Sequence, residues 1–466
     1  MSFSRKLSDT FGRIFDSSPF TIEDPIVKLE YVSRGSNIVV GRGLKGEDHS
    51  ELLFLGKVSE QCSAGKSYLN SDIYLDTTFP HVIYITGTRG SGKSFDLGVI
   101  IEGISPLANS STIQNEVTPI TSIVIDTQSQ FWTLGYEPNG DIPENAAQLE
   151  QLKKWNLKPN RLAKLKVFVP PGTEKFLGTE QEITIRPRDV LPEEWCSLFG
   201  LDLYGPQGHI ISASIEAFEG QDFGISDLIA YVENDSNWPN SSESSRRALL
   251  YKLEDYRRTR LFDETGNGIE QLLTKEHCHL LMLRDLRNED KALITAIIAR
   301  QLFSVMGKMH SKKKVATFFN KTYDGPDLPS KVWLIIDEAH VVAPCDAPSP
   351  ARTALIEYVK RGRDAGLSLV LATQQPSAID DRILSQVNLT INHRLTFQAD
   401  INSATNRIPT KPVQRMKVSG QSYTDFGDMI RLLGPGNSFL SDHGTSRALM
   451  VQIRPRVTAH GGYSPI

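Results

Sequence analysis

The chain has 466 residues, 39% of them hydrophobic, so it can bury a large core and form more than one domain. Its formal net charge of −4 excludes a uniformly basic surface, so a contact with nucleic acid has to be a local patch. The four cysteines, Cys62, Cys196, Cys278 and Cys345, lack the spacing of a zinc site, which favours a reducing compartment. With no run of about 20 apolar residues and no cleavable signal pattern, we expect a cytoplasmic protein without membrane contact.

The first 76 residues contain short apolar runs rather than long periodic segments. Residues 1–23 are polar overall, and we treat them as an N-terminal extension. Within residues 24–76, runs such as Val27–Val32 and Ile38–Val40 alternate with glycines, a pattern typical of short strands. We therefore expect a small β-barrel over residues 24–76. After Val82, strands and helices alternate, which is typical of a parallel sheet covered by helices.

A glycine-rich loop follows the first buried strand of this alternating region. The apolar run Val82–Ile85 leads into Gly87–Ser94, which matches the pattern G-x-x-x-x-G-K-[ST]. The glycines let backbone N–H groups curl around a polyphosphate, and the following helix presents its positive N-terminal end to the anion. We expect Lys93 to reach the β- and γ-phosphates of a nucleoside triphosphate and Ser94 to ligate Mg²⁺. The predicted nucleotide-binding residues are Gly87, Thr88, Arg89, Gly90, Ser91, Gly92, Lys93, Ser94 and Phe95.

The pattern changes between residues 135 and 267. Asn145–Leu165 and Glu243–Arg260 are charged and have a helical period. We expect residues 135–267 to form a mainly helical insertion packed on the core. The alternation of strand and helix resumes with His279–Leu286 and Ala292–Met306.

Three consecutive lysines, Lys312, Lys313 and Lys314, stand before a polar stretch from Asn320 to Ser330. A basic loop at this position can grip DNA phosphates, because such contacts need charge and no base-reading side chain. A solvated surface loop is the alternative interpretation. We therefore keep the three lysines as candidate DNA contacts.

An apolar strand ending in two carboxylates comes next. Val332–Ile336 runs directly into Asp337 and Glu338. Because side chains alternate along a strand, the two carboxylates point in different directions and can do different work. In a chain that also carries a phosphate loop, we expect Asp337 to hold Mg²⁺ through its water shell. We expect Glu338 to act as the general base on the attacking water. An acidic turn facing solvent is the alternative interpretation.

A basic turn and another buried strand follow. The turn contains Arg361 and Arg363, and the apolar strand Leu367–Thr373 ends in Gln374 and Gln375. An arginine on such a turn can reach a neighbouring subunit's site and stabilise transition-state charge, an effect of about 10³ to 10⁵ in rate. From the residues alone, both arginines are equally well explained as helix C-terminal caps or surface cations. The two amides are candidates to sense the γ-phosphate.

Four separated motifs together carry a family resemblance. They are the phosphate loop, W-L-I-I-D-E-A-H at residues 333–340, R-G-R-D-A-G-L-S-L-V-L-A-T-Q-Q-P-S at residues 361–377, and a terminal I-R-P-R…H-G-G. In this order they resemble the HerA branch of the HerA/FtsK ATPases, over most of residues 25–466. In that family, hexameric rings hydrolyse ATP between subunits and pump double-stranded DNA through a central pore.

The resemblance implies ATP and Mg²⁺ as cofactors and a role for several residues. Lys93 and Ser94 match the family's phosphate and magnesium residues, and Asp337 and Glu338 match its metal and water residues. These assignments agree with the chemistry expected from the residues themselves.

The same resemblance bears on the basic turn and the amides. Gln374 or Gln375 matches the sensor amide at the end of the following strand. Arg363 matches the trans-acting arginine, and the family's glycine–arginine turn fits it better than it fits Arg361, which stays an alternative. The predicted catalytic residues are therefore Glu338, Arg363, Gln374, Gln375 and Arg361.

One strand end departs from the family's pattern. Residues 122–131, S-I-V-I-D-T-Q-S-Q-F, stand where the family usually carries a motif like Asp-Pro-His-Gly-Glu-Tyr. Gln130 replaces the usual glutamate, and Thr127 and Gln128 replace the usual pair, although Asp126 is present. We therefore transfer no catalytic role to this strand end.

The resemblance also implies a fold. We expect an α/β chain with a RecA-like P-loop ATPase core over residues 77–134 and 268–466, where the C-terminal tail is included. The β-barrel over residues 24–76 matches the N-terminal barrel of HerA proteins, and residues 135–267 are the helical insertion.

The expected function is that of a ring-forming, hexameric DNA translocase or helicase. Relatives of this kind commonly sit beside a separate nuclease or other effector, including in antiphage defence, so we expect such a partner protein. An alternative is an ATP-gated oligomeric scaffold that assembles and activates an effector without processive translocation. A motor of the conjugation or secretion type is a further alternative, which the absence of a membrane anchor disfavours.

Overall fold

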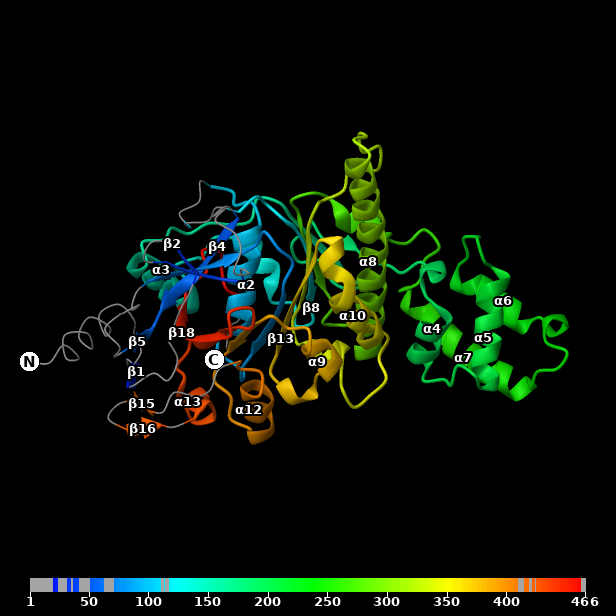
Figure 1. Ribbon diagram of the computed structural model, residues 1–466. Helices are drawn as coiled ribbons and strands as arrows, with labels where there is room; N and C mark the ends of the chain where they lie inside the picture. Colours follow the sequence, from blue (N-terminus) through cyan, green and yellow to red (C-terminus); the bar gives the residue numbers. More distant parts are fainter. Residues whose placement is uncertain are drawn as a thin grey trace, which may run out of the picture.

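The computed structural model contains one large sheet with helices on both faces (Figure 1). It describes residues 20–23, 32–34, 37–41, 51–62, 71–109, 113, 117–409, 415–418, 421–423 and 425–461. The large sheet has 14 strands in the order β10-β9-β11-β8-β12-β13-β7-β14-β17-β18-β4-β6-β3-β2, and a smaller sheet has the order β16-β15-β1-β5.

The centre of the large sheet is parallel, as the alternation of strands and helices predicts. All five residues of β12 are buried, and so are all seven of β13, because helices cover both faces of a parallel sheet. The carboxyl ends of these parallel strands meet at one edge, where Thr86 of β7 pairs with Thr373 of β13. The parallel strands are β7 (Val82–Thr86), β8 (Thr121–Asp126), β9 (Leu165–Val169), β10 (Gln181–Glu182), β11 (Cys278–Met282), β12 (Val332–Ile336), β13 (Leu367–Thr373) and β14 (Leu389–Asn392).

The described part of residues 24–76 extends one edge of the large sheet. Strand β4 pairs with β18, so the sheet runs on from the parallel centre without a break. A separate, closed barrel over residues 24–76 is therefore not confirmed, and residues 24–31, 42–50 and 63–70 lie outside the described residues. The strands of this edge are β2 (Val32–Arg34), β3 (Asn37–Val40), β4 (Leu52–Val58), β6 (Asp72–Asp76), β17 (Asn437–Asp442) and β18 (Arg447–Ile453).

The smaller sheet brings strands from the first 62 residues together with strands from residues 415–423. Strand β1 (Phe20–Glu23) pairs with β15 (Arg415–Val418) on one side and with β5 (Glu60–Cys62) on the other. Strand β16 (Gln421–Tyr423) completes this sheet. Residues 1–19, most of the predicted N-terminal extension, lie outside the described residues.

The helical region in the middle of the chain differs from the expectation of an insertion over residues 135–267. Within those residues, β9 is a strand of the large sheet, paired with β11. The helices α4 (Pro192–Phe199), α5 (Pro206–Ala217), α6 (Ile225–Glu233) and α7 (Glu243–Thr259) follow one another and form a group at one end of the molecule (Figure 1). Helix α3 (Pro143–Lys154) lies at the opposite end of the view.

The longest helix, α8 (Asn288–Phe318), has 31 residues and continues well beyond the predicted end at Met306. By length and composition it is apolar enough to cross a membrane, which we did not expect. Its most apolar window is 61% buried within the structure, and helix α10 (Pro350–Arg361) packs against it. A mostly buried core helix of a soluble protein passes the same test, so α8 is only weak evidence for a membrane span.

Candidate nucleotide-binding site

The glycine-rich loop connects β7 to helix α2 (Lys93–Ile104), as the motif predicts. Gly90 and Gly92 have positive φ angles of 74° and 127°, which glycine adopts far more readily than other residues. Lys93 is only 5% exposed, and its ammonium donates to the carbonyl oxygen of Thr88 at 3.0 Å, across the loop. Burial lowers the pKa of Lys93, and the negative charges of Glu338 and Asp337 oppose that effect. The lysine is thus held over the loop and faces the two carboxylates.

Asp337 and Glu338 come directly after β12, at the same edge of the sheet as the loop. Asp337 is 1% exposed, and burial raises its pKa, as do the negative charges of Asp126 and Glu338. Its Oδ1 atom has no hydrogen-bond partner in the part of the chain that the structure describes. A buried carboxylate oxygen without a partner, beside two other carboxylates, fits a site that holds a cation.

Glu338 is fixed in direction by the strand that follows. Its backbone has φ 49°, a left-handed conformation that is uncommon outside glycine, and it precedes the short helix α9 (Ala339–Val342). The backbone N–H of Gln374 donates to Glu338 Oε2 at 3.2 Å, and the Gln374 side-chain amide donates to Oε1. The structure therefore joins Gln374 to the predicted general base. Gln375 is exposed, and its backbone N–H donates to Thr373 Oγ1 at 3.0 Å.

His340 belongs to this group, although its sequence position gave no reason to assign it there. Its Nδ1 lies 3.4 Å from Glu338 Oε2 and 3.0 Å from Thr373 Oγ1. Burial lowers the pKa of His340, and the nearby Glu338 opposes this. The imidazole closes one side of the carboxylate, so that Gln374 and His340 together leave few orientations open to Glu338.

Asp126 is the last residue of β8 and lies beside these groups, but its carboxylate binds backbone N–H groups of the turn that follows. Its carboxylate accepts the backbone N–H groups of Phe131 at 2.8 Å and Gln128 at 3.1 Å. Burial raises the pKa of Asp126 to about 6, and these N–H groups counteract it. The carboxylate therefore holds the turn over residues 127–131, the one that departs from the family's motif.

A buried histidine packs beneath the phosphate loop and was not identified from the sequence. A Cβ atom on Gly87 would lie 2.7 Å from His393 Cβ, and one on Gly92 would lie 3.0 Å from its Cε1. The imidazole is held at both nitrogens, by Asp96 Oδ2 at 2.6 Å and by the carbonyl oxygen of Asn437 at 3.2 Å. His393 therefore packs directly against Gly87 and Gly92, the first and last glycines of the motif, and leaves no room there for a side chain.

The segment that follows β18 binds helix α2 through an ion pair and hydrogen bonds. Arg454 forms a fully buried ion pair with Glu102, and it also donates to the carbonyl oxygen of Val99 at 3.2 Å. Glu102 accepts the backbone N–H groups of Val457 and Thr458 as well. Burial lowers the pKa of Arg456 to about 10, and a Cβ on Gly98 would lie 2.5 Å from its Nε. We call Arg454, Arg456 and Glu102 the C-terminal clasp.

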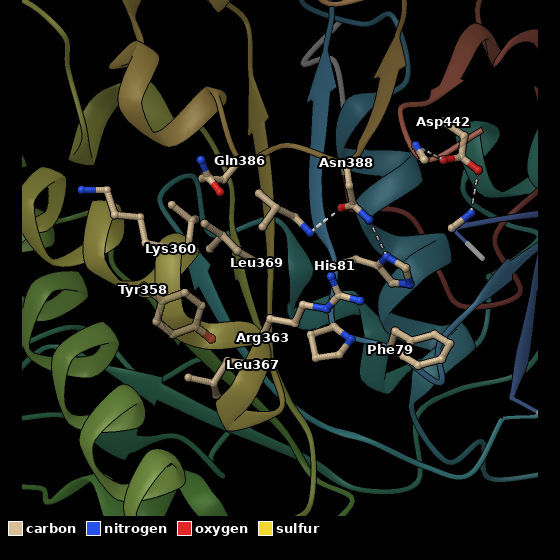
Figure 2. Close-up of a pocket in the computed structure, with 15 residues that line it drawn as sticks. Phe79, His81, Tyr358, Lys360, Arg363, Leu367, Leu369, Gln386, Asn388 and Asp442 are labelled. Atoms are coloured by element: carbon tan, nitrogen blue, oxygen red, sulfur yellow. Dashed lines mark hydrogen bonds between the residues drawn. The ribbon is translucent and has the colours of Figure 1, made fainter. Parts of the chain in front are cut away.

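The basic turn lies at the opposite edge of the sheet. Arg363 precedes β13, whereas Gln374 follows it, and seven residues of strand at about 3.3 Å each separate the two by roughly 20 Å. Arg363 is exposed and lines an open cavity of about 750 Å³ together with Phe79, His81 and Asp442 (Figure 2). The structure thus keeps Arg363 away from the phosphate loop of its own subunit.

Arg361 does not share this position. Its side chain is 67% exposed and lies 3.5 Å from Glu357 Oε2, one helical turn earlier in α10. Arg363 instead affects the buried His81, whose pKa is lowered by burial and also by the Arg363 charge. Of the two arginines, Arg363 is the one that belongs to the cavity.

The three candidate DNA-binding lysines do not lie on a loop. Lys312, Lys313 and Lys314 are in the last turns of α8, which projects beyond the rest of the molecule (Figure 1). The apolar pattern ends near Met309 because the helix leaves the core there, and the helix itself continues to Phe318. The prediction of a basic loop is therefore wrong, although the lysines are at the surface.

A Mg²⁺ ion fits the carboxylate group only through indirect contacts. No group of three or more His, Cys, Asp or Glu side chains could hold a metal by itself within the described ranges. Mg²⁺ typically keeps several waters and binds through one or two carboxylates and substrate phosphates. Ser94 and Asp337, with the unpartnered Oδ1, are the residues that suit such an ion.

Comparisons with known proteins bear on the family of this chain. The family model of the helicase HerA central domain matches residues 59–302, just over half of the chain. The DNA double-strand break repair helicase HerA of Pyrococcus furiosus is 24% identical over 317 residues, which cover 58% of this chain and 54% of that protein. The Probable helicase MJ1565 of Methanocaldococcus jannaschii is 24% identical over 217 residues, covering 45% and 38%. Both matches therefore span less than two thirds of the relatives' lengths.

Solved structures share the fold at much lower identity. VirB4 of Thermoanaerobacter pseudethanolicus has a TM-score of 0.56 and 12% identity, with 88% of this chain and 98% of that chain covered. The bacterial conjugative coupling protein TrwBdeltaN70 has a TM-score of 0.50 and 11% identity, with 82% and 87% covered. At such identities the likeness concerns the mixed α/β fold alone. The family model, in contrast, covers the phosphate loop and β8 with its surroundings, and it shows that the chain belongs to the family of the helicase HerA central domain.

Proposed function

We propose that this chain is an ATP hydrolase that assembles into a hexameric ring and moves double-stranded DNA through the central pore. The observation that carries the proposal is the split of the site between the two edges of the sheet. Lys93, Glu338 and Gln374 gather at the carboxyl edge, and Arg363 lies at the amino edge. A ring in which one subunit's amino edge faces its neighbour's carboxyl edge brings these groups together.

The geometry supports a division of labour among the residues. The loop N–H groups and Lys93 bind and orient the triphosphate, and Ser94 and Asp337 hold the ion. Mg²⁺, when bound, neutralises charge on the phosphate oxygens. Glu338, held by Gln374 and flanked by His340, is directed to take a proton from the attacking water. Arg363 of the adjacent subunit stabilises the charge that develops on the transferred phosphoryl group.

The experiment that tests the proposal measures hydrolysis and movement together. We expect double-stranded DNA to stimulate ATP hydrolysis, and the protein to displace a third strand from a triplex at a rate that depends on ATP. Lys93→Ala should abolish both, because phosphate binding is lost. Hydrolysis without strand displacement would contradict the translocase and favour an ATP-gated scaffold.

One observation favours a partner protein, which fits both the translocase and the scaffold. The helical group α4–α7 carries Tyr204, which is 92% exposed, and Tyr251, which is 75% exposed, on elements remote from the nucleotide residues. Large exposed aromatic side chains are typical of protein interfaces. We extend the proposal accordingly to a cytoplasmic ring that works with a separate nuclease or other effector in antiphage defence; this extension depends on the family resemblance.

A further inference from the structure

The free end of α8 forms a surface that the nucleotide site does not use. Burial along this helix stops at Met309, and His310 is tied to the body by a contact of its Nε2 with the carbonyl oxygen of Ser330 at 2.9 Å. Beyond it, residues 311–323 stand clear of the rest of the molecule at the top of the view (Figure 1). We call residues 311–323 the α8 tip.

The charge of the α8 tip is positive throughout. The chain has no aspartate or glutamate from residue 301 to residue 323, whereas its overall net charge is −4. The lysines at or next to the tip are Lys308, Lys312, Lys313, Lys314 and Lys321. Such a local concentration of one sign in an acidic protein attracts a polyanion.

Aromatic rings lie among these lysines. Phe318 is 82% exposed and Phe319 is 61% exposed, and their rings meet edge to face with centroids 5.1 Å apart. The Lys321 ammonium lies 5.9 Å from the centre of the Phe319 ring, and the Lys313 ammonium lies 5.3 Å from that of Tyr323. After the helix, Asn320 adopts φ 53°, which turns the chain back so that Lys321 returns to the rings.

The lysines surround the helix instead of occupying one side. Consecutive residues of an α-helix are about 100° apart around its axis, so Lys312, Lys313 and Lys314 point in three different directions. By the same spacing, Lys308 lies between Val315 and Phe319. A helix that rests on a membrane or in an apolar protein groove has a separate apolar face. On the α8 tip, the exposed Val315, Phe318 and Phe319 share one side of the helix, but Lys308 and Lys312 lie on that side as well. This interleaving of cations and rings favours nucleic acid.

We propose that the α8 tip binds single-stranded nucleic acid, with phosphates at Lys312, Lys313 and Lys314 and bases stacked on Phe318 and Phe319. Exposed rings add binding energy only where a base has a free face, and the bases of a duplex are stacked on one another. This inference rests on the proposed function as a DNA motor and specifies a second form of the substrate: an unpaired strand outside the pore.

The test measures fluorescence anisotropy of the full chain with three labelled probes: a 20-nucleotide oligothymidine, a uridine RNA of the same length, and a 20-base-pair DNA duplex. We expect Phe318→Ala combined with Phe319→Ala to weaken oligothymidine binding about tenfold or more, with little change for the duplex. Phe318→Tyr with Phe319→Tyr keeps both ring faces and should retain the affinity. Phe176→Ala removes a ring that is 76% exposed elsewhere and serves as the matched control.

The lysines give a separate readout. Replacing Lys312, Lys313 and Lys314 with alanine should reduce the slope of log affinity against log salt by about 2 for the single strand, since each phosphate contact contributes about 0.7. Arginine at the same three positions should restore the slope. The phenylalanine variant should leave the slope unchanged, because stacking releases no counterions.

Three results would overturn the inference: no binding of the oligothymidine by the wild type, equal losses on single strand and duplex, or a loss of ring assembly without a change in affinity per assembled ring. RNA bound more tightly than DNA would move the assignment from DNA to RNA within the same chemistry. The proposed function is judged separately, by ATP hydrolysis and triplex displacement of the wild type. Either result can therefore fail while the other stands.

Discussion

The two edges of the central sheet differ in how far each subunit satisfies its own polar groups. At the carboxyl edge, Lys93 donates to Thr88, and Gln374 donates twice to Glu338. At the amino edge, Arg363 stands beside an open cavity, and its side chain has no hydrogen bond or ion pair to any residue that the structure describes (Figure 2). One edge is prepared for a ligand, and the other presents a cation to the outside.

Strand β13 joins the two edges. Arg363 lies four residues before its first residue, and Gln374 follows its last. Seven hydrogen-bonded residues of β13 therefore connect the cation at one edge to the amide that holds Glu338 at the other edge. In the proposed ring, the site is divided between subunits, and the predictions below test that division.

The largest effect is expected at the amino edge. Arg363→Ala should lower ATP turnover about 10³- to 10⁵-fold, because the transition-state charge loses its trans-acting partner. Arg361→Ala is the matched control, and its turnover should stay near that of the wild type, since Arg361 pairs with Glu357 away from the cavity. Specific activity of the wild type should also rise with protein concentration.

Mixing variants decides whether Arg363 acts in trans. Arg363→Ala and Glu338→Gln subunits, each inactive alone, should regain part of the activity when mixed, because some interfaces then hold one intact Arg363 and one intact Glu338. Native mass spectrometry would verify that mixed rings form. If mixed rings form and remain inactive, Arg363 does not act across the interface.

At the carboxyl edge, Glu338→Gln should reduce turnover by about 10² to 10⁴ while ATP binding is kept, because only the proton acceptor is lost. Nucleotide binding can be measured by equilibrium titration with a fluorescent ATP analogue. Turnover at the wild-type rate would show that another group takes the proton.

The ion pair that holds helix α2 beneath the carboxyl edge can be removed without changing a residue of the nucleotide site. Glu102→Gln removes the negative charge of the C-terminal clasp and leaves Arg454 buried without a counterion, which should lower the free energy of unfolding by about 3 to 5 kcal/mol. Glu150→Gln is the control: its pair with Lys153 is exposed and screened by solvent, so its loss should change the free energy of unfolding little. Urea unfolding measures both, and equal shifts would refute a special role for the clasp.

Asp126 gives the smallest expected effect and a pH signature. Its pKa is raised from 3.8 to about 6 in the folded protein, so folding favours the protonated form. Stability from this group is complete below pH 3.8 and is lost as pH rises through 6, a loss of about 3 kcal/mol at 1.36 kcal/mol per pKa unit. Asp126→Asn should remove this dependence. If the free energy of unfolding, measured with urea, changes with pH by the same amount in variant and wild type between pH 4 and pH 7, the prediction is wrong.

Much of the carboxyl edge could be predicted from the sequence because its parts are local. The loop, the acidic strand end and the amides each follow directly after an apolar strand, and parallel strands bring such ends to one edge. The pair of His393 and Asp96 could not be predicted in this way. The two residues are 297 positions apart, and neither has a motif around it that signals the contact.

At the end of α8, a prediction from local sequence was wrong. The sequence predicted that the helix ends at Met306 and that a basic loop follows, yet the helix runs on to Phe318. Hydrophobic period reports which residues are buried, whereas lysine and alanine favour a helix also in solvent. Strand β9 was missed for a related reason, since five residues within a helix-rich region give a weak signal.

The C-terminal clasp has a consequence for how the protein is made. Arg454 lies 352 positions after Glu102, yet it supplies the counterion of Glu102 in the helix that follows the phosphate loop. While the chain is being synthesised, Glu102 lacks this counterion until Arg454, 352 positions later, has left the ribosome. A truncated product that ends before residue 454 therefore carries the full nucleotide motif on an unfastened helix.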